Sequence, residues 1–269
     1  MGGYGRGMSY RELTAPAGLA GLVECGWDDT ATADGTHDVL PDGCMDLVWT
    51  GAELVVAGPD TVAHPGRRLR GVTAAGLRFL PGALPSLLDV PAAPLQNQRV
   101  SLVDLVPGPA REALARLEHG VEPVSVLVAL AAELPGEPPD RSVAALRHAL
   151  ASGGCGQQAA QAPAATPTPA GSVAALADAL GCTPRSVHRR CQAAFGYGPA
   201  VLRRVLRFRR AAALLRAGVS PAEVAAAAGY ADQPHLSRET RALAGASPRQ
   251  LASGANRSTP LPSGSCTTA

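Results

Sequence analysis

The sequence predicts a multidomain α+β chain, with a β-rich N-terminal domain, a small helical segment and an all-α C-terminal domain that holds two helix-turn-helix units in tandem. Three observations lead to this fold class. Short apolar runs separated by turn signals occupy the front of the chain. A helix, a Gly-centred turn and a second helix occur twice near its end. A segment without charge or large apolar side chains lies between these two parts.

Five segments are expected in order along the chain. They are a β-rich domain over residues 9–106, a helical segment over 107–152, a flexible linker over 153–171, the tandem helix-turn-helix domain over 172–252 and a disordered tail over 253–269. The linker cannot bury enough surface to order itself. We therefore expect the front domain to act on the C-terminal domain by controlling dimerisation or by masking it, and not by rigid leverage. Met8 is an alternative translation start.

The front domain has the pattern of a small β-barrel or sandwich. Its apolar runs are Met45–Trp49, Leu54–Ala57 and Gly71–Leu80, and signals such as Gly58-Pro59-Asp60 mark turns between them. Three leucine-rich helices should follow and pack together as a small bundle. Their expected ranges are Pro109–His119, Val124–Leu134 and Asp140–Ala151.

The C-terminal domain contains an internal repeat, because residues 172–199 reappear loosely as residues 220–248. The turn glycines Gly181 and Gly229 are 48 positions apart, and after one extra turn residue Arg189 and Arg238 are 49 apart. Local signals place the helix ends. Ser220, Pro221 and Glu223 form an N-cap, a first-turn Pro and a capping box, and the glycines suit the left-handed conformation that a tight turn requires.

The second helix of each unit leaves one polar face unburied, while apolar residues at spacings of three and four bury the other. In the first unit this face carries Arg185, Ser186, His188, Arg189 and Gln192, and in the second Gln233, His235, Ser237, Arg238 and Arg241. Such side chains can donate to phosphates and to base edges. A solvated surface is the alternative for one such helix, but two copies favour DNA recognition.

A basic helix, Pro199–Ala217, should connect the two units. About 18 residues make a rod of about 27 Å, comparable to the spacing of about 34 Å between successive major grooves on one side of a duplex. The helix carries five arginines within eight residues: Arg203, Arg204, Arg207, Arg209 and Arg210. We expect phosphate contacts from this group, chiefly from Arg203, Arg204 and Arg207; a solvated charged face is the alternative.

The charge distribution is strongly asymmetric, although the net charge is only +2. Residues 1–140 hold 9 Arg against 18 acidic residues, whereas residues 171–251 hold 12 Arg against 4 acidic residues. A domain with a net charge of +8 attracts DNA regardless of sequence, and this attraction weakens as salt rises.

GYADQPHLSR at Gly229–Arg238, the following SPRQL and the paired motif with its connecting helix resemble the DNA-binding domain of the AraC/XylS family of bacterial transcription regulators. The resemblance covers Ser172–Leu251. It implies that the second helix of each motif enters the major groove, with Arg185, His188 and Arg189 in the first unit and Gln233, His235, Ser237 and Arg238 in the second. The chain departs from the family pattern at a buried aromatic position, which holds Cys191 in one unit and Thr240 in the other. Phe195, Phe208 or Tyr230 are candidates to fill that space.

Three N-terminal stretches, LVECGW at Leu22–Trp27, LPDGCMDLVW at Leu40–Trp49 and the sequence from Gly76 to Leu95, resemble a poorly characterised domain found ahead of AraC-type DNA-binding domains. This resemblance implies a cupin-like fold that senses a small molecule or mediates dimerisation.

Two alternatives involve different chemistry. A cupin-type metalloenzyme would need clustered histidines, and the front of the chain has only His37, His64 and His119. A thiol-based redox sensor could use Cys25 and Cys44, although the six cysteines include no CxxC pair and these two are expected to be buried as small apolar residues. A methyl-accepting DNA-repair protein is a further alternative, but such proteins need a four-cysteine zinc site at the front of the chain, where this sequence has only Cys25 and Cys44. We therefore expect no enzyme activity, no metal and no other cofactor.

Taken together, the residues and the resemblance predict a sequence-specific DNA-binding transcription regulator. Its expected partners are double-stranded DNA and a small-molecule effector, with RNA polymerase and a second copy of the chain as further candidates. No apolar stretch is long enough to span a membrane, and no secretory segment is recognised at the N-terminus. We therefore expect the protein to act in the cytoplasm.

Overall fold

The structure is a computed structural model that describes residues 10–152 and 172–253. The predicted linker, nearly all of the predicted tail and Met8 therefore lie outside the described residues. Among the described residues, no helix combines the length and the apolar character that a membrane crossing requires.

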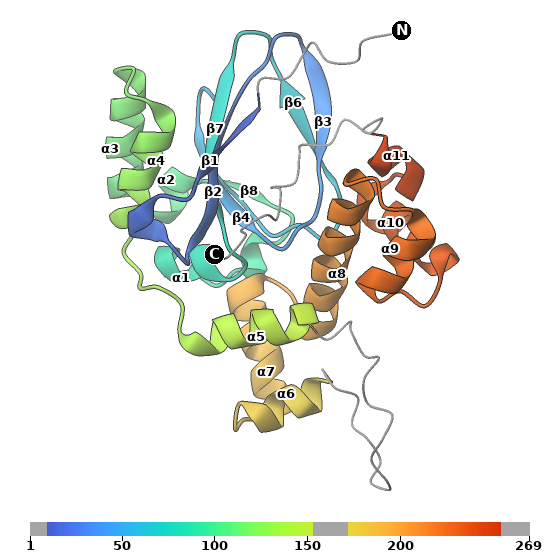
Figure 1. Cartoon of the computed structure of the whole chain (residues 1–269). Coiled ribbons are helices and arrows are strands. Elements are labelled where there is room, and N and C mark those ends of the chain that lie inside the picture. The colour runs from blue at the N-terminus through green and yellow to red at the C-terminus, as the bar shows by residue number, and fades with distance from the viewer. Residues whose placement is uncertain (1–9, 153–171, 254–269) are drawn as a thin grey trace, which may run out of the picture.

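The N-terminal domain is built on antiparallel strands, as the apolar runs predicted. The strands are β1 (Arg11–Thr14), β2 (Val23–Thr30), β3 (Gly35–Val39), β4 (Met45–Trp49), β5 (Leu54–Ala57), β6 (His64–Arg68), β7 (Thr73–Phe79) and β8 (Arg99–Ser101). Six of them form a sheet in the order β1-β2-β7-β4-β5-β8, and β3 pairs with β6 in a separate ribbon. Figure 1 shows this ribbon beside the larger sheet.

The six-stranded sheet has one apolar face and one polar face, because successive side chains on a strand point in opposite directions. On the apolar face, residues such as Leu47, Leu77 and Phe79 are fully buried in the largest core of the described chain. Helices cover this face: α1 (Ala83–Leu88), α2 (Leu102–Leu105), α3 (Pro107–Glu118) and α4 (Pro123–Ala132), with short 3-10 turns at Ala17–Leu19 and Ala93–Leu95. The opposite face carries Asp46 and Arg78, and it looks toward the β3–β6 ribbon.

The predicted three-helix bundle is wrong for its last helix. Helices α3 and α4 pack on each other and on the sheet, but α5 (Arg141–Ser152) leaves them and joins the C-terminal domain. Its Leu146 and Leu150 are buried in a core with residues of α6, α7 and α8. The proline-rich stretch after α4 carries the chain past α1, where Gly136 N donates to Leu87 O (2.8 Å). The apolar face of α5 is therefore buried by a partner that follows it in sequence.

The C-terminal domain contains the two predicted helix-turn-helix units, so the predicted fold class is confirmed. Its helices are α6 (Val173–Ala179), α7 (Pro184–Phe195), α8 (Pro199–Arg216), α9 (Pro221–Ala228), α10 (Gln233–Ala244) and α11 (Pro248–Ala252). The first half of α8, with Leu202 and Val205, belongs to the core of the first unit. Its second half, with Phe208 and Leu215, belongs to the core of the second. One helix is thus the shared spine of both units.

Small residues, Cys191 and Thr240, are buried in α7 and α10, the second helices of the two units and the candidate recognition helices. Cys191 is fully buried in the same core as Phe195. Thr240 is also fully buried, and its hydroxyl donates to Leu236 O (2.7 Å), so it leaves no unsatisfied hydroxyl. Phe208 and Tyr230 are buried in the core to which Leu236 belongs. All three aromatic candidates therefore lie in the two cores, and the filling of the space beside Cys191 or Thr240 by one of them stays a prediction.

The N-terminal domain packs directly against both helix-turn-helix units. Figure 1 shows the first unit below the sheet and the second beside the β3–β6 ribbon, with α8 running between them. Leu40 and Ala63 contribute to the core of the second unit, and Arg209 of α8 forms an ion pair with Glu24 of β2. The expectation that the front domain has no rigid connection to the C-terminal domain is therefore wrong. The reason is that the two domains contact each other directly, through residues outside 153–171.

Candidate nucleic-acid interface

The beginning of each recognition helix is held by a side-chain cap. Thr183 Oγ1 accepts a hydrogen bond from Ser186 N (3.2 Å) at the start of α7, and Asp232 Oδ1 accepts one from His235 N (2.6 Å) at the start of α10. The preceding turns contain Gly181 with φ of 58° and Gly229 with φ of 77°, values in the left-handed region that glycine adopts at little cost. The Ser220–Glu223 capping box predicted for α9 is present.

The predicted recognition residues of α7 all lie on its outer face. Arg185, His188 and Arg189 are exposed, while Val187 and Cys191 on the opposite face are fully buried. The ring of His188 lies against Gly198, because a Cβ added at Gly198 would approach the imidazole to 2.6 Å. The two arginines have no hydrogen bond or ion pair with any described residue, so their guanidinium groups are available to an external acceptor.

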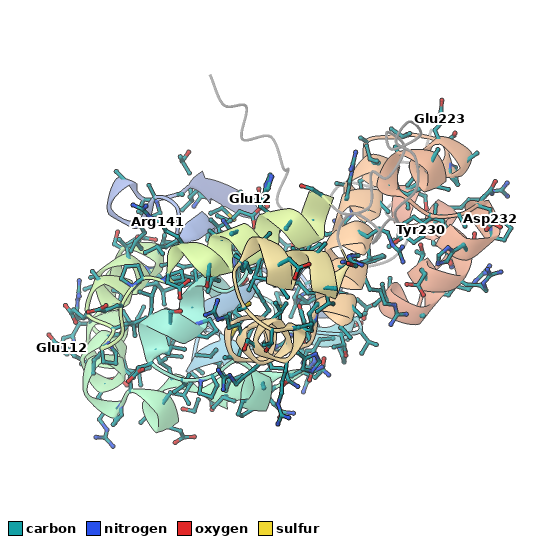
Figure 2. The ribbon with its side chains drawn as sticks, turned by 90° about the horizontal axis from the view of Figure 1, so that it is seen from below. Glu12, Glu112, Arg141, Glu223, Tyr230 and Asp232 are labelled. Atoms are coloured by element: carbon teal, nitrogen blue, oxygen red, sulfur yellow. The ribbon has the colours of Figure 1, made fainter. Side chains whose placement is uncertain are left out.

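The predicted residues of α10 divide into two classes. Gln233 and Arg238 are exposed, and Arg238 has no hydrogen bond or ion pair within the described residues. His235 and Ser237 are partly buried. The imidazole of His235 accepts from Ala231 N through Nδ1 (3.4 Å) and packs edge-on against Tyr230 at 5.3 Å. Figure 2 shows Asp232 at the outer edge of this unit and Tyr230 on the side that faces α8.

The basic residues of α8 have partners inside the protein. Arg204 Nε donates to Glu239 of α10 (2.7 Å), and Arg207 lies 3.7 Å from the same carboxylate. Arg207 also lies over the ring of Tyr230, with 4.4 Å from Cζ to the ring centre. These contacts add to the apolar packing that joins α10 to α8. Phosphate contacts by Arg204, Arg207 and the partly buried Arg203 remain predictions.

A second candidate site lies in the N-terminal domain, between the polar face of the sheet and the β3–β6 ribbon. It is a cavity of about 330 Å³ with a largely apolar wall that includes Trp27, Val48 and Val55. Charged groups also line it, among them Asp29, Asp46, Arg68, Arg78 and Arg99. A space of this size, with a largely apolar wall and charged groups that could orient a bound molecule, is typical of a small-molecule site.

The floor of the cavity is a buried group of charges. Arg78, whose side chain is 6 % exposed, donates to both oxygens of Asp46 (3.3 and 3.2 Å) and lies 3.6 Å from Asp42. Trp27 Nε1 also donates to Asp46 (3.1 Å). Burial raises the pKa of the Asp46 carboxyl, and the Arg78 charge opposes this rise. Arg78 Nη1 has no hydrogen-bond partner among the described residues.

Sequence reasoning did not identify Trp27, Asp46, Arg78 or Arg99 as site residues. A usable signal was present, because Asp46 and Arg78 are single charges inside otherwise apolar runs of strand residues. A charge at such a position must be paired when the strand is buried on both faces.

Acid should destabilise the N-terminal domain through His37, which lines the cavity. Burial, followed by the charge of Arg68, lowers the pKa of His37 to about 4. As the pH falls from about 6.5 to about 4, His37 is protonated in the unfolded chain but stays neutral in the folded chain. The free energy of unfolding should therefore fall by about 2 kcal/mol, after allowance for the partial exposure of His37. Replacing His37 with Gln should flatten this part of the stability profile, measured by urea unfolding at several pH values. An unchanged slope in the variant would contradict the assignment.

Burial opposes deprotonation of the two thiols of the N-terminal domain. Cys25 and Cys44 are both buried and free. Burial raises the pKa of Cys25 to about 12 and that of Cys44 well above its usual value. The described residues contain no group of three or more His, Cys, Asp or Glu side chains that could hold a metal ion.

Comparison with known proteins gives two family matches. Residues 176–253 match a family model described as a helix-turn-helix domain, of the AraC type, and residues 11–101 match a domain of unknown function (DUF6597). A comparison with curated proteins found no match.

Among solved structures, the chain is similar to ToxT from Vibrio cholerae O395, with a TM-score of 0.44 and 8% identity over 91% of this chain and 97% of that one. It is also similar to an apo variant of ToxT from Vibrio cholerae strain SCE256, with a TM-score of 0.43 and 8% identity over 91% and 96% of the two chains. Likeness at this level does not extend to function.

Proposed function

Because the chain carries an AraC-type helix-turn-helix domain behind a domain of unknown function, we propose that it is a sequence-specific transcription regulator in which both recognition helices bind one DNA duplex. The observation that carries this proposal is the equivalence of Arg189 and Arg238. They occupy matching positions of the repeat, both are exposed, and neither has a hydrogen bond or ion pair within the described residues.

The geometry of the C-terminal domain supports simultaneous binding by both units. Helix α8 has 18 residues and a length of about 27 Å, and each of its halves belongs to the core of a different unit. Arg185, His188 and Arg189 on α7 and Gln233, His235, Ser237 and Arg238 on α10 are the proposed contacts to bases. The Arg excess over residues 171–251 provides the attraction to phosphates.

We also propose that the N-terminal domain senses a small molecule in the cavity between the sheet and the β3–β6 ribbon. Its apolar wall favours a ligand with an apolar surface, and the buried Arg78 Nη1, which has no hydrogen-bond partner in the part of the chain that the structure describes, favours a ligand with a hydrogen-bond acceptor. Dimerisation is the other role proposed for this domain. The thiol-sensor alternative is disfavoured because burial opposes formation of the Cys25 and Cys44 thiolates.

The proposed site of action is the bacterial cytoplasm, with double-stranded DNA as the main partner and RNA polymerase as a further one. The test is selection of bound sequences by the full-length chain from randomised duplex DNA. The expected result is an enriched site with two half-sites about 10 base pairs apart, whose binding weakens steeply as salt is raised. Recovery of unenriched DNA, with equal affinity for every sequence, would refute sequence-specific regulation.

A further inference from the structure

We propose that the loop between β5 and β6, residues 58–63, is a brace that fixes the relative orientation of the two recognition helices and links it to the cavity. The proposal rests on the DNA-binding function above and concerns its regulation. The loop lies in the N-terminal domain, far in sequence from either helix-turn-helix unit. It nevertheless contacts the C-terminal ends of both α7 and α10.

The first contact is at the end of α7. The last carbonyls of a helix have no partner within the helix, and here Ala92 N of the N-terminal domain donates to Ala193 O (2.7 Å). Pro59 of the loop packs on the glycine that ends the helix, since a Cβ added at Gly196 would lie 2.5 Å from Pro59 Cγ and 3.2 Å from Ala92 O. No side chain larger than hydrogen fits between the loop and this helix end.

The second contact is at the corresponding end of α10. Ala63 N, in the same loop, donates to Leu243 O (2.7 Å). Ala63 also packs against the core of the second unit. One short loop therefore contacts both recognition helices near their C-termini and leaves the predicted DNA-contacting residues of their outer faces uncovered.

The loop is held firmly enough to act as a brace. Asp60, which is 6 % exposed, accepts two hydrogen bonds from Arg99 of β8 (2.6 and 3.0 Å). Asn97 Oδ1 accepts from Thr61 N (2.8 Å), and Asn97 N donates to Pro59 O (3.2 Å). At the start of the loop, Gly58 N donates to Gln98 O (2.9 Å). Backbone contacts thus tie the loop to the segment before β8, and the charged contact ties it to β8 itself.

The same loop borders the cavity. Ala57 and His64, the residues that flank it, both line the cavity, and so does Arg99, which holds Asp60. A molecule that draws Arg99 toward the cavity would release Asp60, and with it the contacts to both recognition helices. The brace therefore gives cavity occupancy a direct route to the geometry of DNA binding.

A fixed orientation has a measurable consequence for DNA binding. When two DNA-binding units are rigidly linked, both can bind the same duplex only if the spacing of the half-sites matches the spacing of the units. We therefore expect insertion of two base pairs between the selected half-sites to weaken binding by the wild type about 100-fold. A variant in which the loop is held less firmly should lose less affinity when the two base pairs are inserted.

The test compares Asp60→Asn, Arg99→Gln and Asn97→Ala with the matched control Asp28→Asn, which removes a carboxylate paired with Arg11 at the edge of the sheet. In the first three variants the insertion penalty should fall to about tenfold or less, with affinity for an isolated half-site unchanged. The control should retain the wild-type penalty. A full penalty in folded Asp60→Asn and Asn97→Ala proteins would overturn the brace, and a full penalty in Arg99→Gln alone would overturn its link to the cavity.

A second measurement needs no DNA and therefore separates this proposal from the proposed function. In the free wild-type protein the amides of Ala63 and Ala92 should be protected from hydrogen exchange, because their acceptors lie in the other domain. Exchange at Ala63 should become faster in Asp60→Asn. Unprotected amides at both positions in the wild type would overturn the brace, whatever the outcome of the DNA selection.

Discussion

Replacement of Arg78 with Met is expected to lower the free energy of unfolding of the N-terminal domain by about 3 to 5 kcal/mol, because breaking a buried ion pair leaves uncompensated charge. Arg78 is the buried cation between Asp42 and Asp46, both of which are themselves buried. Without the guanidinium, the charges of these two buried carboxylates are left uncompensated. Urea unfolding monitored by the fluorescence of Trp27 and Trp49 measures the change.

The matched control is Arg11→Met, which removes the same type of side chain from an ion pair on the surface. Arg11 is 72 % exposed in its pair with Asp28, so the loss should be at most about 1 kcal/mol. The deficit of Arg78→Met should also shrink when the pH is lowered from about 7 to about 5, because burial raises the pKa of the Asp46 carboxyl and its protonation therefore favours the folded state. Equal losses in the two variants would show that the Arg78 cluster is not electrostatically important.

Replacement of Arg189 or Arg238 with Ala is expected to weaken binding to the selected DNA site by about 1 to 3 kcal/mol each. This range corresponds to a loss of affinity of about 5- to 150-fold, and binding to random DNA should change little. The physical reason is that a guanidinium group with no hydrogen bond or ion pair among the described residues can donate two hydrogen bonds to one guanine. Titration of labelled duplexes at constant salt measures both affinities.

Arg190→Ala is the matched control, since Arg190 is an exposed neighbour of Arg189 that does not belong to the predicted recognition set. Its removal should lower affinity for specific and random DNA alike, as expected for a purely electrostatic contribution. If Arg189→Ala and Arg238→Ala behave in the same way as this control, the two arginines bind phosphates and do not select bases.

The C-terminal domain was largely predictable from the chain alone because its signals are local. A Ser–Glu capping box, prolines in first helical turns and glycines at tight turns act within a few residues. The periodic placement of Val187 and Cys191 likewise decides which face of α7 is buried without reference to distant parts of the chain. The same locality made the apolar runs of β4 and β5 recognisable as strands.

Features that depend on distant partners were not predictable in this way. Leu146 and Leu150 give α5 an ordinary apolar face, and only the packing shows that this face belongs to the core of the first helix-turn-helix unit. Glu239 could equally have been solvated, but in the fold it pairs with Arg204, 35 positions earlier. A periodic pattern specifies that a face is buried and carries no information about the surface that buries it.

The order of the elements, the helix boundaries and the outward faces of α7 and α10 therefore follow from near-neighbour chemistry. The cavity with its Arg78–Asp46 floor and the loop from Gly58 to Ala63 that contacts both recognition helices follow from tertiary packing. The physical reason is the range of the interactions. Caps and turns are satisfied within one helical turn, whereas a buried charge or a carbonyl at a helix end is satisfied by whichever group the fold brings beside it.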